Sequence, residues 1–96
     1  MTVRKLSTAE EEFFEAVAYY FAESPPSADR FIDEAERCLK LIHNAPNRYP
    51  IWQEDVRNKL FEKFPYSILY RIVDDEIVVV SYFHHKREPS SWKLNV

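Results

Sequence analysis

The last third of the chain holds two long apolar runs rich in β-branched and aromatic residues, a pattern typical of β-strands. The runs flank the dipeptide Asp74-Asp75, and because Asp tolerates positive φ better than most residues, this dipeptide predicts a two-residue hairpin turn. The expected register pairs Ile72 with Ile77, Tyr70 with Val79, Ile68 with Ser81 and Tyr66 with Phe83 on one face, and Arg71 with Val78, Leu69 with Val80 and Ser67 with Tyr82 on the other.

The first half of the chain repeats apolar residues at helical spacing, which predicts two helices. The first is expected to begin with capping boxes that pair Ser7 and Thr8 with the glutamates after them, and to end near Glu23, before Pro25-Pro26. The second is expected to begin with Ser27 as its N-cap and to end at Asn44, in a left-handed C-cap. The short turn between them predicts an antiparallel helical hairpin.

The remaining segments complete a single α+β domain over residues 1–96. Thr2 to Leu6 is expected to form a short strand on the sheet, residues 47–55 a loop with exposed Tyr49, Ile51 and Trp52, and residues 56–64 a third strand beside the hairpin. The predicted order is therefore β-α-α-β-β-β, with two helices packed on one face of a small antiparallel sheet.

Both faces of the predicted hairpin are apolar, but the helices can cover only one of them. The other face would leave an apolar patch near solvent, edged by basic residues, and such a patch usually binds a partner protein. The segment after the hairpin is expected to be a short tail, in which Trp92 caps the edge of the core from a loop, with an anchor in an interface as the alternative. The patch comprises Phe61, Leu69, Val78, Val80, Tyr82 and part of Trp92.

Composition removes several classes of function. The chain has 96 residues and no glycine, which excludes glycine-rich phosphate loops and the nucleophile elbow. Cys38 is the single cysteine, and because it lies in a helical apolar stripe it is expected to be a buried thiol. With one cysteine the chain has no zinc-binding motif, and no cofactor is expected. A net charge of −3 counts against a free-standing nucleic-acid binder. Without an apolar run long enough for a membrane span or a secretory signal, we expect no membrane association and a cytoplasmic location.

Polar side chains collect where the second strand of the hairpin ends. Because histidine side chains titrate near neutral pH, His84 and His85 are candidates for acid–base chemistry, although their position at a strand end favours a structural, hydrogen-bonded role. A second candidate is a phosphate-binding surface, for which a solvated charged face is the alternative. It would comprise Arg57, Lys59, Lys63, Arg71 and Arg87.

The stretch FPYSILYRIVDDEIVVVSYFHHKREPSSW (64–92), together with EAVAYY, AERCLKLIHNAP and VRNKLFEKFPY earlier in the chain, resembles the RelE/ParE toxin superfamily of bacterial type II toxin–antitoxin systems, which includes plasmid stabilisation proteins. The resemblance implies a small toxin that arrests growth unless a cognate antitoxin binds to its helices and sheet. One branch cleaves mRNA on the ribosome with a basic cluster and no metal. The other branch inhibits DNA gyrase by binding to it.

Compared with the nuclease branch, Arg87 matches the tail arginine, and Arg57 and Lys59 match basic strand residues. Ser67 stands where those nucleases carry an arginine, and Lys93 stands where a tyrosine general base is expected. These departures and the acidic charge favour the ParE-like branch, with the nuclease, or a non-toxic member that keeps the fold, as alternatives.

The two branches imply different site residues. For a nuclease, the catalytic set would be Arg57, Lys59, His84, His85 and Arg87. For a protein inhibitor, the residues expected to bind the target or the antitoxin are Arg57, Lys59, Phe61, Leu69, Arg71, Tyr82, Arg87 and Trp92.

Overall fold

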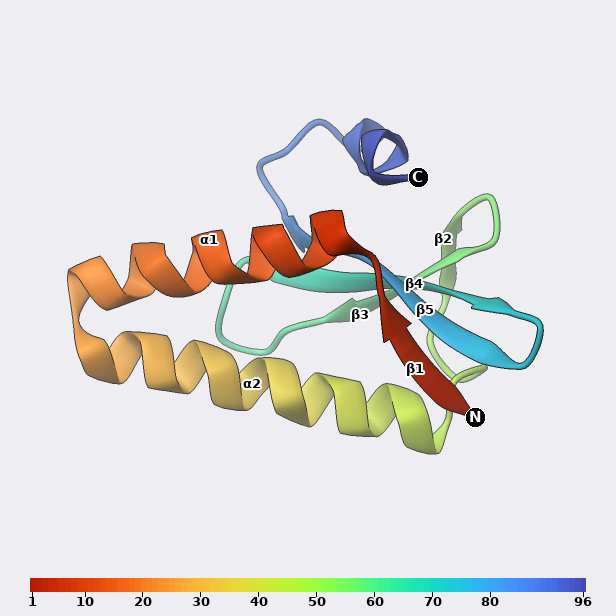
Figure 1. The fold of residues 1–96 in the computed structure, drawn as a ribbon, viewed down its shortest axis with the longest axis horizontal. Coiled ribbons are helices and arrows are strands. Elements are labelled where there is room, and N and C mark those ends of the chain that lie inside the picture. The colour runs from red at the N-terminus through yellow and green to blue at the C-terminus, as the bar shows by residue number, and fades with distance from the viewer.

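The computed structural model describes residues 1–96 and shows an α+β fold, as predicted (Figure 1). The elements are β1 (Thr2–Lys5), α1 (Ser7–Glu23), α2 (Pro25–Asn44), β2 (Ile51–Gln53), β3 (Val56–Leu60), β4 (Tyr66–Val73), β5 (Glu76–His84) and the 3₁₀-helix η1 (Ser91–Asn95). The strands form one sheet in the order β1-β5-β4-β3-β2. All neighbours are antiparallel except β1 and β5, which run parallel, so the sheet is mixed. No helix is both long and apolar enough to cross a membrane.

The helices end where predicted, but α2 begins at Pro25, before the predicted N-cap Ser27, and the caps of both helices differ from the prediction. The backbone N–H of Leu6 donates to the carbonyl of Val79, so pairing with the sheet continues up to the residue before α1. Leu6 is therefore the N-cap, no side chain caps the helix, and the predicted capping boxes do not form. For α2 the N-cap is Ser24, whose hydroxyl accepts a hydrogen bond from the backbone N–H of Ser27, with proline in the first turn.

Two other local predictions are wrong. Asn44 is the last helical residue of α2 and has no left-handed conformation; positive φ occurs only at Glu54, Asp74 and Asp75. The segment expected to be a loop contains the edge strand β2, which pairs with β3 through a tight turn at Glu54 (φ 52°). The third predicted strand ends early, at residue 60, because the chain then turns back toward β4.

Phe31 of α2 lies at the centre of the core between the helices and the sheet. Its side chain is fully buried, and its ring centroid lies 5.1–6.0 Å from those of five other aromatic rings. These rings come from α1, from β4 and from the turn before it: Phe13, Tyr20, Phe61, Phe64 and Tyr66. Edge-to-face and stacked aromatic pairs add about 0.5–1.5 kcal/mol each beyond simple burial.

The predicted hairpin register is correct near the turn and wrong beyond it. Asp74 and Asp75 have φ of 48° and 63°, and the pairs from Val73–Glu76 to Tyr70–Val79 form as expected. A β-bulge then shifts the register, so that the remaining pairs are Leu69–Ser81, Ile68–Tyr82, Ser67–Phe83 and Tyr66–His84. One extra residue in β5 exchanges the faces of all the side chains that follow it.

The second face of the sheet is covered by the protein's own C-terminal segment, so the expected open apolar face is absent. Trp92 of η1 is 2% exposed and packs with Val56, Leu69, Val80 and Phe83. Its indole N–H donates to the Gln53 side-chain oxygen over 2.8 Å. Figure 1 shows η1 set apart from the helical hairpin, near the start of α1.

Four of the residues expected to bind the target or the antitoxin are therefore not available at the surface. Phe61 and Tyr82 pack in the core beneath the helices, the latter because of the bulge, and Leu69 and Trp92 lie in the second core. None of these four side chains is more than 5% exposed.

Replacing Trp92 with Ala should lower the free energy of unfolding by about 3–5 kcal/mol, because a large buried side chain is lost and a cavity remains. Urea denaturation followed by circular dichroism measures the change. Leu94→Ala, in the same short helix but at a residue 85% exposed, is the control and should change stability by less than about 0.5 kcal/mol. Equal effects of the two substitutions would contradict the conclusion that Trp92 covers the second face of the sheet.

Candidate functional site

Apart from Lys63, which lies in the turn before β4, the basic residues expected to form a nucleic-acid or protein site lie on different parts of the sheet and bind groups of the protein itself. Arg57 donates to the backbone carbonyls of Tyr49 (2.7 Å) and Asn47 (3.1 Å), and Arg71 makes a two-pronged contact with Asp55 at 3.0–3.1 Å. The Lys59 ammonium donates to a backbone carbonyl and lies 5.2 Å from the centroid of the Tyr49 ring.

Strand register separates these side chains further. Arg57 lies opposite Tyr70 in β4, whereas His84 lies opposite Tyr66 on the other side of the same strand. Four residues along a strand span about 13 Å, so the two groups cannot meet around one phosphate. Arg71 pairs with Val78 two residues from the hairpin turn, further still from His84.

Arg87 is held by Glu12, a residue in the second turn of α1. One carboxylate oxygen of Glu12 forms an ion pair with the Arg87 guanidinium, which also stacks over Phe83 at 4.8 Å. The other oxygen accepts hydrogen bonds from the Ser81 hydroxyl (2.8 Å), the Tyr82 backbone N–H (3.2 Å) and the side chain of Asn95 (3.1 Å). We call this set of contacts the Glu12 junction.

One sequence signal marks Glu12. It lies three residues after Ala9 and four before Ala16, which are the two fully buried residues of α1, and so it shares their side of the helix. Its side chain is 18% exposed, whereas the neighbouring Glu10, Glu11 and Glu15 are exposed.

The two histidines lie on opposite sides of the strand end. His84 packs edge-on against Tyr66, and its Nδ1 accepts the backbone N–H of Lys86. Burial, followed by the nearby positive charges of Lys86 and His85, lowers the pKa of His84, so its imidazole is neutral near pH 7. The ring of His85 shares a 2.8 Å hydrogen bond with the Ser67 hydroxyl.

A shallow hollow of about 330 Å³ adjoins His84, Tyr66, Tyr19, Glu15 and Arg87. Burial raises the pKa of Tyr66 to about 12, which keeps its hydroxyl protonated at neutral pH and removes it as a general base. With the one arginine neutralised by Glu12, this hollow has no free cation to stabilise a developing phosphorane charge.

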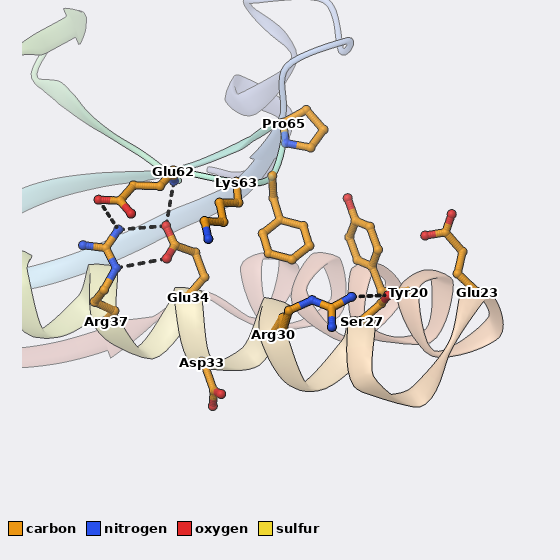
Figure 2. Close-up of a pocket in the computed structure, with 11 residues that line it drawn as sticks. Tyr20, Glu23, Ser27, Arg30, Asp33, Glu34, Arg37, Glu62, Lys63 and Pro65 are labelled. Carbon is orange, nitrogen blue, oxygen red and sulfur yellow. Dashed lines mark hydrogen bonds and ion pairs between the residues drawn. The ribbon is translucent and has the colours of Figure 1, made fainter.

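The largest hollow, about 660 Å³, lies between the helices and the turn before β4 (Figure 2). Three of its charged side chains, Glu34, Arg37 and Glu62, are paired with one another. The Glu34 carboxylate accepts two hydrogen bonds from Arg37 (3.0 and 2.8 Å) and one from the backbone N–H of Glu62 (2.7 Å), and these bonds, led by Arg37, lower its pKa. This arrangement fastens the turn to α2 and includes no nucleophile poised beside a base. No cluster of His, Cys, Asp or Glu has the geometry to hold a metal ion.

The Glu12–Arg87 ion pair should be measurable by a double-mutant cycle. We expect Glu12→Gln and Arg87→Gln to be less destabilising together than the sum of the two single changes, with a coupling of about 1–2 kcal/mol for this partly exposed, hydrogen-bonded pair. Unfolding in urea gives each free energy. The control cycle pairs Glu11→Gln with Arg87→Gln and should be additive within about 0.5 kcal/mol; additivity in both cycles would rule out the pair as a structural link.

Comparison with known proteins agrees with the fold and the residue pattern. The family model described as the ParE toxin of the type II toxin–antitoxin system, parDE, matches residues 3–89. Toxin ParE2 of Mycobacterium tuberculosis, from two strains, is 29% identical over 91 residues, which cover 91% of this chain and 84% of the relative.

A solved structure described as the chromosomal ParDE TA system from P. aeruginosa has the same fold, with a TM-score of 0.77 over 88% of this chain and 95% of that one, at 18% identity. The predicted superfamily is thus confirmed. Because the family match spans nearly the whole domain, including both helices and the hairpin, the chain belongs to the ParE toxin family of type II toxin–antitoxin systems.

Proposed function

We propose that this protein is a toxin that acts in the cytoplasm by binding a protein target, DNA gyrase, and that a cognate antitoxin neutralises it. The observation that carries the proposal is the internal pairing of the arginines: Arg57, Arg71 and Arg87 are each engaged by the protein itself. A ribosome-directed nuclease needs such cations free and convergent, whereas a binding protein does not.

The two departures from the nuclease pattern have structural roles here. Ser67 is 1% exposed and bonds to His85, so no side chain projects from this position toward a substrate. Lys93 forms an ion pair of 3.0 Å with Glu54 across the second face of the sheet. Both positions support a protein-binding mode of action. Of the expected binding residues, Arg57, Lys59, Arg71 and Arg87 remain candidates at the surface.

Inducible expression of the protein alone should arrest growth with an induced DNA-damage response, and co-expression of a cognate antitoxin should restore growth. Purified protein should inhibit supercoiling by gyrase and leave mRNA in programmed ribosomes intact. Leu94→Ala, at an exposed residue, is the matched variant that should behave as wild type in both assays.

Two results would contradict this proposal. Normal growth at verified expression levels would exclude toxicity. Cleavage of A-site mRNA that Arg87→Ala abolishes, without inhibition of supercoiling, would assign the protein to the nuclease branch instead.

A further inference from the structure

The outer edge of the sheet, formed by β2 and the end of β3, holds a small, open hollow with apolar walls. The hollow has a volume of about 290 Å³ and is lined in part by Ile51 and Leu60, each 57% exposed. Trp52 lines it as well; one side of its ring packs on Phe83, with 5.7 Å between centroids, and the side chain is 36% exposed. Figure 1 shows β2 at this edge, away from α1. Exposed apolar side chains gathered at one hollow are typical of a protein-binding surface.

Backbone and side-chain groups at this edge lack partners within the protein. The backbone N–H of Asn58 donates to the carbonyl of Pro50, so Ile51 and Arg57 form a pair without mutual hydrogen bonds. The N–H and C=O of Ile51 therefore point away from β3, toward the free edge. The side-chain oxygen of Asn58, which lines the hollow, is buried and has no hydrogen-bond partner. A segment of extended chain added at this edge can pair with Ile51 and supply a donor to Asn58.

The same edge is locally basic, although the net charge of the chain is −3. Arg48, Arg57 and Lys59 form no ion pair. Arg57 and Lys59 donate to backbone carbonyls, which leave the positive charges of these side chains uncompensated. The two carboxylates of the turn between β2 and β3 are already paired with other cations. The apolar hollow is thus bordered by three positive charges that no carboxylate of the protein neutralises.

We propose that this edge, from Arg48 to Leu60, binds an extended acidic segment of the target protein, with one apolar side chain in the hollow and carboxylates beside Arg48 and Lys59. The inference rests on the proposed action through a protein target, and it names the surface that contacts that target. Charge complementarity selects this partner, because a second copy of the chain would bring three cations against three cations. A nucleic acid would match the cations but not the apolar side chains, and the net negative charge of the protein would repel it.

The test measures binding of purified variants to immobilised DNA gyrase by surface plasmon resonance. Ile51→Ser with Leu60→Ser should weaken binding at least about tenfold, because apolar side chains at the centre of an interface dominate its affinity. Arg48→Glu with Lys59→Glu should also weaken binding at least about tenfold, and should remove most of the loss of affinity that added salt causes in the wild type. Inhibition of supercoiling should fall in parallel with binding.

Matched controls separate a specific surface from general damage. Leu94→Ser changes an apolar side chain that is 85% exposed in η1, and Arg30→Glu with Lys40→Glu reverses two exposed cations on α2. Both controls should bind gyrase as the wild type does, and circular dichroism should show that every variant is folded. The edge variants should keep wild-type affinity for the cognate antitoxin, because the proposed partner of this edge is the target.

The outcomes distinguish this inference from the function on which it rests. If the wild type binds gyrase and the edge variants bind equally well, or if the controls lose as much affinity, the edge is wrong and the proposed function stands. If the edge variants lose the antitoxin as well, or if the wild type binds a DNA duplex without gyrase and Arg48→Glu with Lys59→Glu abolishes that binding, the partner is wrong and the inference is overturned. If the wild type does not bind gyrase at all, the proposed target fails, and this inference fails with it.

Discussion

The carboxylate of Glu12 joins three parts of the protein that are far apart in sequence. It binds the backbone of β5 at Tyr82, the arginine that follows β5, and Asn95 in the C-terminal turn. Asn95 in turn donates to the carbonyl of Val80 and accepts the hydroxyl of Thr8. A partly buried charge with this many partners is costly to leave unpaired, so the helix, the strand and the C-terminal segment are held in one arrangement.

The β-bulge in β5 determines which face of the sheet Tyr82 and Phe83 occupy, and therefore how they lie relative to the Glu12 junction. Without the extra residue, Tyr82 would point to the second face of the sheet and Phe83 to the helices. With it, Tyr82 enters the aromatic core and Phe83 faces Trp92 and supports the Arg87 guanidinium. A single inserted residue thus provides both cores with the aromatic side chain that completes them.

Sequence reasoning identified the elements whose signals are local and missed those decided by distant contacts. The helices and the Asp74-Asp75 turn follow from periodicity and backbone preference. The N-cap of α1 was missed because pairing of Leu6 with β5 overrides the capping preference of nearby side chains. The bulge has no sequence mark, and the cover by Trp92 depends on a partner, Gln53, that lies in a strand read as a loop. The partners of the basic residues were also missed, because local sequence signals do not reveal which other parts of the chain these residues contact.

The parallel pairing of β1 with β5 has a consequence for the time at which the protein becomes active. Residues 2–5 find their partners only at residues 76–79, and Thr8 finds its partner only at Asn95. Both ends of the chain therefore complete the structure together, and contacts between residues this far apart in sequence slow folding. Before residues 76–95 have left the ribosome, the sheet of a nascent chain is incomplete and Glu12 is unpaired, so the final fold cannot form. An antitoxin that is already present can meet this protein as soon as it is complete.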